Sequence, residues 1–96
     1  MPGTKTEPIE RQQDSGYSGR YAAIIFNNES NSFEEVIDII MLATSCAFEE
    51  ARIETWEAHT YGQAPVHFAT EAECMRVAAT IASIGVRTEV RKEWEN

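Results

Sequence analysis

Basic side chains are scarce in this chain of 96 residues, which has 8 lysines and arginines against 16 acidic residues and a formal charge of -8 at pH 7. A polyanion is bound through clusters of Lys and Arg that displace its counterions, and the sequence has no such cluster. We therefore expect no nucleic-acid partner. An anionic membrane surface is excluded for the same reason.

Long apolar runs and cysteine pairs are also missing. No run approaches the roughly 18 to 20 residues that span a bilayer, and residues 1–20 lack the apolar segment of a signal peptide, so we expect a cytoplasmic protein that binds no membrane. The only two cysteines, Cys46 and Cys74, are too far apart in sequence for paired metal ligands and give no disulfide framework. We expect two buried thiols, no metal and no cofactor.

Proline and glycine concentrate at the start of the chain. Residues 1–20 hold two of the three prolines, three of the five glycines and a single large aliphatic side chain, Ile9. Such a composition cannot bury enough apolar surface to fold, so we predict a disordered N-terminal arm at residues 1–20. The remaining residues, 21–96, are enough for one small globular domain and too few for two.

The first part of this domain is predicted to be a strand followed by a helix. Residues 21–26, YAAIIF, form a short apolar run typical of a buried strand. After a polar turn, Ser32 and Glu35 have the spacing of a capping box, which marks the start of a helix. The apolar residues that follow recur at helical spacing, and we expect this helix to fray near residues 44–45.

A second helix follows directly, at about residues 48–61. Gly62 is placed to take the left-handed conformation that ends it, and Ser45 or Cys46 would precede it as a loose cap. Four glutamates would form its outward, solvated stripe, namely Glu49, Glu50, Glu54 and Glu57.

The last part of the domain is predicted to be strand, helix and strand. Residues 66–68 are a brief strand, Thr70 and Glu73 form another capping box, and residues 86–92 alternate like a half-exposed strand. The order is β-α-α-β-α-β, which predicts an α+β fold, a three-stranded antiparallel sheet with three helices packed on one face. The buried stripe of the third helix, which Gly85 would end, is predicted to be Ala72, Met75, Ala78, Ala79 and Ala82.

Motifs of catalysis are absent from the sequence. It has no glycine-rich phosphate loop, no nucleophile elbow and no His-Glu-x-x-His helix, so we do not expect an enzyme. His59, His67 and Cys74 could be drawn as a metal site, but small metal sites normally have ligands paired two to four residues apart.

Polar residues gather where the first strand ends. Asn27, Asn28 and Glu29 follow the strand, and His59 lies on the second helix. A neutral imidazole, the Asn27 carbonyl and the Glu29 carboxylate are acceptors that could converge on an ammonium group without a competing cation. Alternatively, the asparagines only shape the turn and His59 is only a polar residue near a helix end.

A hollow is expected beside these acceptors. Thr55 and Ala58 share one face of the second helix, because they are three residues apart. If the two helices pack side by side, these small residues face Phe33 and Val36 and leave a recess. Such a recess would take a large apolar side chain, and together with the acceptors it predicts a site for a free amino terminus.

A series of residues in fixed order extends this pattern along the chain. They are Tyr21 and its strand, Asn27, Glu34, the run 36–38, Ala51, His59, Gly62, Ala64, the helix start at 70–71, Arg76 and Val77. In order and spacing the chain resembles the ClpS family of adaptors. These adaptors bring substrates with bulky apolar amino-terminal residues to the ClpA or ClpC unfoldase of an AAA+ protease.

The resemblance implies a role for each matching position. Asn27 and His59 would bind the substrate's α-amino group, while Asn28 and Glu29 stand where the family usually has aspartates that orient the first peptide unit. Asn31 replaces a threonine that contacts the peptide backbone. Side chains of Phe33, Val36, Thr55 and Ala58 would line the pocket, with Phe33 where a methionine is usual. Glu71 and Arg76 match positions that dock on the unfoldase.

Two functions remain open at this point. The first is an adaptor that binds N-degron peptides and delivers substrates to a ClpA- or ClpC-type unfoldase, working as a monomer. The alternative is an interaction module that keeps the fold but not the pocket, in which Phe33 fills the recess and the acidic helix surface binds something basic.

Overall fold

A computed structural model of the protein describes residues 20–93. Except for Arg20, the predicted arm at residues 1–20 lies outside the described residues. The elements are β2 (Tyr21–Phe26), α1 (Phe33–Thr44), α2 (Phe48–Tyr61), β3 (Gln63–Ala69), α3 (Glu71–Ala82) and β4 (Thr88–Lys92). The predicted order of strands and helices is confirmed.

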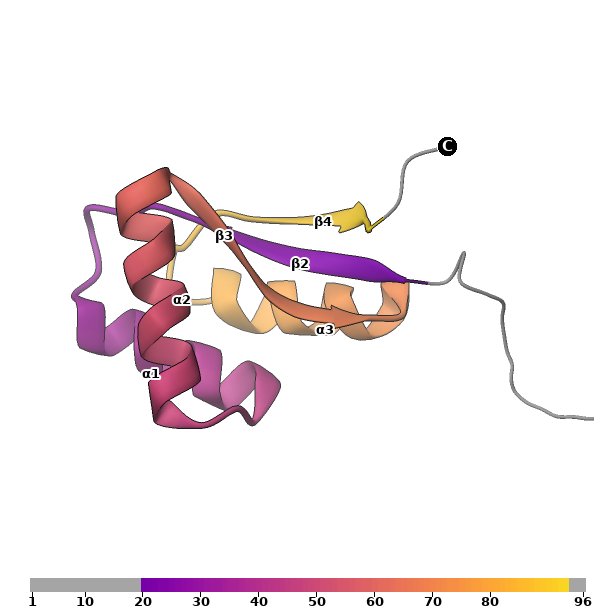
Figure 1. Cartoon of the computed structure of the whole chain (residues 1–96), viewed down its shortest axis with the longest axis horizontal. Coiled ribbons are helices and arrows are strands. Elements are labelled where there is room, and N and C mark those ends of the chain that lie inside the picture. The colour runs from indigo at the N-terminus through magenta and orange to yellow at the C-terminus, as the bar shows by residue number, and fades with distance from the viewer. Residues whose placement is uncertain (1–19, 94–96) are drawn as a thin grey trace, which may run out of the picture.

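The three strands form one antiparallel sheet in the order β3-β2-β4. Tyr21 pairs with Ala69 of β3 and with Lys92 of β4, and a bulge interrupts the β2–β3 ladder between Ala23 and Ile24. Because β2 is the central strand, residues 22–25 are all buried. All three helices lie on one side of the sheet, so the predicted fold class is confirmed (Figure 1).

The core lies between the inner face of the sheet and the helices, chiefly α1 and α3. Its largest fully buried side chains are Ile25, Ile40, Val77, Ile81 and Cys74. They come from β2, α1 and α3, and α2 contributes to the core only Ala51 and Ala58. Helix α2 therefore adds only small side chains to a core built from the sheet, α1 and α3.

The predicted ends of α1 and α2 are largely confirmed. The hydroxyl of Ser32 accepts a hydrogen bond from the Glu35 backbone, and the Glu35 carboxylate accepts one from the Ser32 backbone. Gly62 ends α2 at a φ of 93°, a conformation that L side chains rarely adopt. Helix α1 ends at Thr44, as expected.

Two predicted caps are wrong. Helix α2 has Ala47 at its N-cap and no side-chain cap, because Ser45, at a φ of 62°, instead closes α1. At the start of α3, Thr70 accepts from the Glu73 backbone, but the Glu73 carboxylate binds Arg76 instead of returning to complete a capping box.

The predicted stripe of α3 is also wrong, apart from Ala78. The helix buries Cys74, Val77, Ala78 and Ile81, while Met75 is 57% exposed. Both stripes have helical spacing, and the observed one buries the branched side chains, which gain more from burial than alanines do. Strand β3 is longer than predicted, at Gln63–Ala69, and the last strand begins at Thr88, two residues later than predicted.

Candidate functional site

A hollow of about 180 Å³ opens between α1, α2 and the loop that follows β2. We call it the α1–α2 recess. It is lined by all nine residues predicted for peptide binding: Asn27, Asn28, Glu29, Asn31, Phe33, Val36, Thr55, Ala58 and His59. Sequence reasoning missed three lining residues, Ile25, Phe26 and Ser32, although the first two end the strand that leads into the loop.

The inner wall of the recess is apolar. Ala58 and Thr55 are each 4% exposed and Val36 is 7% exposed. The Thr55 hydroxyl donates to the Ala51 carbonyl of its own helix over 2.8 Å, so this donor is already used. Because the hydroxyl bonds backward along α2, a ligand would meet the apolar part of this side chain.

Phe33 lies at the rim and leaves the recess open. Its ring is 40% exposed and meets the imidazole of His59 edge-on, with 5.5 Å between ring centroids. An aromatic contact of this kind restrains both rings. The pair therefore joins the first turn of α1 to the last turn of α2 across the recess.

Backbone contacts hold Asn27 at the opposite rim. Its N–H donates to the Gly62 carbonyl over 2.9 Å, which ties the end of β2 to the end of α2. Its Oδ1 accepts a hydrogen bond from the Asn28 N–H over 3.0 Å. A carbonyl oxygen has two lone pairs, so Asn27 keeps one acceptor site for a ligand.

Asn28 uses its side chain to build the loop. Its Oδ1 accepts from the backbone N–H groups of Ser30 and Asn31, and its Nδ2 donates to the Gly85 carbonyl over 3.2 Å. This is the turn-forming role that the sequence left open for the asparagines. Glu29 is exposed and makes no hydrogen bond or ion pair with residues 20–93, so its carboxylate is available.

The recess thus joins an apolar wall to a polar rim without a cation. Asn27, Glu29 and His59 offer acceptors at the rim, and no lysine or arginine among residues 20–93 lines the hollow. An ammonium group needs such acceptors, and an apolar side chain attached to it would be buried against the wall.

Glu54 departs from the predicted outward stripe of α2. Its side chain is partly buried, and Oε1 is covered without a hydrogen-bond partner among the described residues. Loss of water raises the pKa of this carboxyl to about 8, with further contributions from the charges of Glu50 and Glu57. Glu49 and Glu50 are exposed, as predicted.

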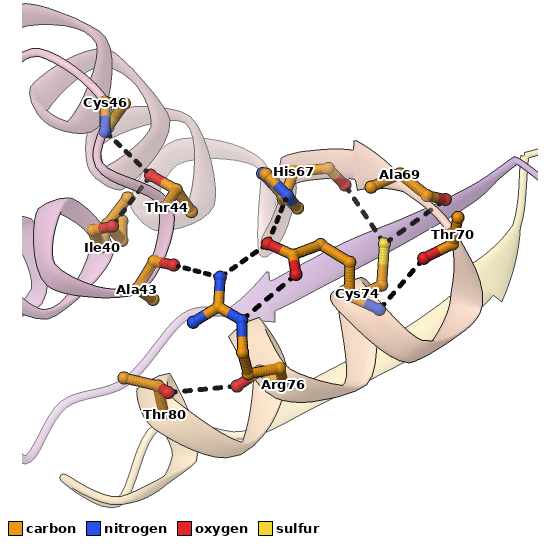
Figure 2. Close-up of polar contacts among 11 residues, drawn as sticks. Ile40, Ala43, Thr44, Cys46, His67, Ala69, Thr70, Cys74, Arg76 and Thr80 are labelled. Carbon is orange, nitrogen blue, oxygen red and sulfur yellow. Dashed lines mark hydrogen bonds and ion pairs between the residues drawn. The ribbon is translucent and has the colours of Figure 1, made fainter.

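The two residues predicted to dock on a partner lie on the first turns of α3, away from the recess. Glu71 is exposed, and Arg76 Nη2 donates to the Ala43 carbonyl over 3.0 Å and to the Glu73 carboxylate over 2.6 Å (Figure 2). The Arg76 guanidinium lowers the pKa of Glu73. Arg76 therefore ties α3 to the end of α1 while about half of its side chain stays exposed.

His67 and Cys74 have structural contacts close to this point. His67 Nε2 lies 3.4 Å from the Glu73 carboxylate, and the fully buried Cys74 thiol faces the carbonyls of His67 and Ala69. Burial raises the pKa of Cys74. Both cysteines are free thiols; Cys74 is fully buried, and Cys46 is half-buried at the edge of the core.

Residues 20–93 contain neither a candidate metal site nor a membrane-spanning helix. No group of three His, Cys, Asp or Glu side chains is placed to hold a metal ion. None of the three helices in this part of the chain has the length and apolar character to cross a bilayer.

The fold and recess define a small α+β protein with an open pocket beside a cation-free rim. The family model for ClpS, the ATP-dependent Clp protease adaptor protein, matches residues 17–89. The chain therefore belongs to the ClpS family of Clp protease adaptors.

The fold is similar to that of a solved structure, Agrobacterium tumefaciens ClpS2 bound to L-phenylalaninamide. The TM-score is 0.74 at 16% identity, with 80% of this chain and 100% of that chain covered. At this identity the likeness supports the fold alone. A search of curated proteins found no match.

Proposed function

We propose that this protein binds free amino termini bearing bulky apolar residues in the α1–α2 recess and delivers such substrates to a Clp-type AAA+ unfoldase in the cytoplasm. The observation that supports this most directly is the open hollow of about 180 Å³ with acceptors at its rim. Asn27, Glu29 and His59 would hold the α-amino group. Val36, Thr55 and Ala58 would surround the side chain.

The chemistry of the relative's ligand agrees with this pairing. L-phenylalaninamide, bound to Agrobacterium tumefaciens ClpS2, combines a free amino group with an apolar ring. Burying such a ring is worth about 1.5 to 3 kcal/mol, whereas the ammonium needs acceptors to replace its water. The recess offers both environments within one hollow.

The start of α3 is proposed as the surface that meets the unfoldase. Glu71 and the exposed part of Arg76 are separated from the recess, so the protein could hold a substrate and an unfoldase together. This surface is anchored to α1 through the Arg76–Ala43 hydrogen bond, which keeps its position fixed relative to the pocket.

The alternative interaction module requires Phe33 to fill the recess. The ring instead lies at the rim against His59, which supports the pocket-based function. The acidic surface of α2 still provides a site for a basic partner. Peptide binding separates the interaction module from the adaptor.

Fluorescence anisotropy with labelled peptides tests the proposal. A peptide that begins with Phe should bind the full chain, and acetylation of its amino terminus should abolish binding, because the ammonium is lost. His59→Ala should weaken binding at least tenfold, while His67→Ala, a histidine away from the recess, should leave it unchanged. Equal binding of acetylated and free peptides would exclude the ammonium site.

Delivery is tested with the same variants. A folded reporter starting with Phe should be degraded by a ClpA- or ClpC-type protease only when the adaptor is present. Arg76→Ala should slow degradation and leave peptide affinity unchanged. If degradation is unaffected by Glu71→Ala and Arg76→Ala together, the docking surface lies elsewhere.

A further inference from the structure

A second concavity lies directly beside the recess, on another face of α1. This hollow of about 280 Å³, here called the α1 groove, is lined by Asn31, Glu35, Asp38, Ile39, Leu42 and Ile84. Four of these residues are spaced three or four apart along α1 and so lie on one helix face. Ile84 comes from the turn between α3 and β4. Sequence reasoning missed this groove.

The groove has an apolar floor and an acidic lip. Leu42 is 71% exposed, which is unusual for a large aliphatic residue beside a hollow, and the buried Ile39 lines the same hollow. Glu35 and Asp38 form no ion pair with residues 20–93. The Glu35 carboxylate already accepts hydrogen bonds from Ser32 and Asn31, whereas Asp38 has no hydrogen-bond or ion-pair partner within residues 20–93. An apolar surface beside the free Asp38 carboxylate fits a side chain with an aliphatic stem and a cationic end.

Asn31 connects the α1 groove to the recess. Its side chain lines both hollows, and Nδ2 donates to Glu35 Oε1 over 3.2 Å. Its Oδ1 is buried without a hydrogen-bond donor among the described residues. Asn31 is the one described residue that lines both hollows, so the two hollows are separated by the width of a single side chain. A bound peptide that leaves the recess would therefore reach the groove within a short distance.

We propose that the α1 groove binds the part of the substrate that follows its amino-terminal residue and favours an arginine among residues 2 to 4. This inference rests on the proposed function of the recess. An extended peptide advances about 3.3 to 3.6 Å per residue, so two or three residues past the first cover the width of a side chain such as Asn31. The arginine stem would pack on Leu42, and its guanidinium would face Asp38.

The charge of the molecule also favours this occupant. The described residues carry no lysine or arginine in either hollow, so a basic substrate segment meets no repulsion there. Arginine suits the site better than lysine because its planar, weakly hydrated head pairs with carboxylates in a fixed geometry.

Anisotropy titrations of the full chain test this proposal with four peptides that all begin with Phe. One has alanine at positions 2 to 4, and the others place a single arginine at position 2, 3 or 4. We expect at least one arginine peptide to bind about two- to fivefold tighter than the alanine peptide, the range of exposed ion pairs. The gain should shrink as salt is added.

Matched variants locate the effect. Asp38→Asn should remove most of the arginine gain without changing the affinity of the alanine peptide. Glu34→Gln removes the same charge from the same helix outside both hollows, and it should keep the gain. Leu42→Ala leaves the charge of the groove unchanged but removes the surface on which the arginine stem would pack. It should therefore reduce the affinity gained from arginine.

The outcomes separate this proposal from the function of the recess. If the alanine peptide binds but arginine gives no gain at any position, or the gain survives in Asp38→Asn, the groove proposal is overturned and the recess function stands. Failure of every free amino terminus to bind would overturn both. Tight binding of the acetylated arginine peptide would show that the protein binds basic segments without using the recess. That result would also overturn the proposal.

Discussion

Helix α1 packs along a filled seam with α3 and along an open seam with α2. The buried residues of α3 are Cys74, Val77, Ala78 and Ile81, whereas those of α2 are only Ala51, Thr55 and Ala58. Helix α3 buries two branched side chains, Val77 and Ile81, whereas the buried residues of α2 are all small and leave a hollow beside them. The recess is therefore encoded in the size of the residues at a helix contact.

The largest expected effect is a loss of stability when a large buried side chain of α3 is removed. Ile81 is fully buried, so Ile81→Ala should lower the free energy of unfolding by about 3 kcal/mol, through lost transfer energy and a new cavity. Urea denaturation followed by circular dichroism measures it. Met75→Ala, on the exposed side of the same helix, should cost less than about 1 kcal/mol. A small loss for Ile81→Ala would mean that the seam is not packed as described.

Filling the open seam should affect binding more than stability. Ala58→Leu places a branched side chain in the recess, and should weaken binding of a Phe-starting peptide at least tenfold, since the ligand loses about 1.5 to 3 kcal/mol of burial. The unfolding free energy should change by about 1 kcal/mol or less, because the recess has room for the side chain. Anisotropy and urea denaturation measure the two quantities.

A leucine on an exposed face is the control for this variant. Ala79→Leu on α3 should leave the peptide affinity unchanged. Undiminished binding by Ala58→Leu would show that the ligand does not enter the open seam.

The smallest effect concerns the partly buried carboxyl of α2. Glu54 has a pKa near 8 in the folded state, above its ordinary value of 4.5, so the folded protein binds this proton more tightly than the unfolded chain. Stability should therefore fall as pH rises from about 4.5 to 8. Glu54→Gln should remove that loss and stabilise the protein by about 1 kcal/mol above pH 8, less than the shift alone implies because water still reaches the side chain.

The pH profile distinguishes this explanation from a general charge effect. The difference between Glu54→Gln and the original chain should vanish below pH 4.5, as measured by thermal or urea unfolding. Glu34→Gln, at an exposed position of α1, should change stability little at any pH. A gain for Glu54→Gln that persists at pH 4 would contradict a titration of residue 54.

The sequence predicted the parts of this molecule that depend on local spacing. The Ser32–Glu35 capping box, the stop at Gly62 and the order of elements follow from short-range backbone chemistry. The prediction of which face of α3 is buried was wrong because two stripes of apolar residues on this helix have the same helical period. Only packing against the sheet favours Val77 and Ile81 over the neighbouring alanines.

The site was predictable to the extent that its residues follow one another along known elements. Asn27 through Phe33 surround the end of a strand and the start of a helix, so their proximity follows from the chain itself. The contacts of Asn28 with Gly85 and of Phe33 with His59 join distant segments, and no local pattern encodes them. The α1 groove could not be predicted from local spacing because it needs Ile84 from the turn that follows α3.

The β2–α1 loop is anchored at two distant points, by the Asn27 N–H on Gly62 and by the Asn28 side chain on Gly85. A rim fixed in this way is preorganised, so capture of a ligand would need little ordering of the protein. Association would then proceed at an ordinary docking rate of about 10⁵ to 10⁷ M⁻¹s⁻¹ for every acceptable amino terminus. Discrimination among substrates would lie in their residence times, with poorly fitting chains released before an unfoldase can engage them.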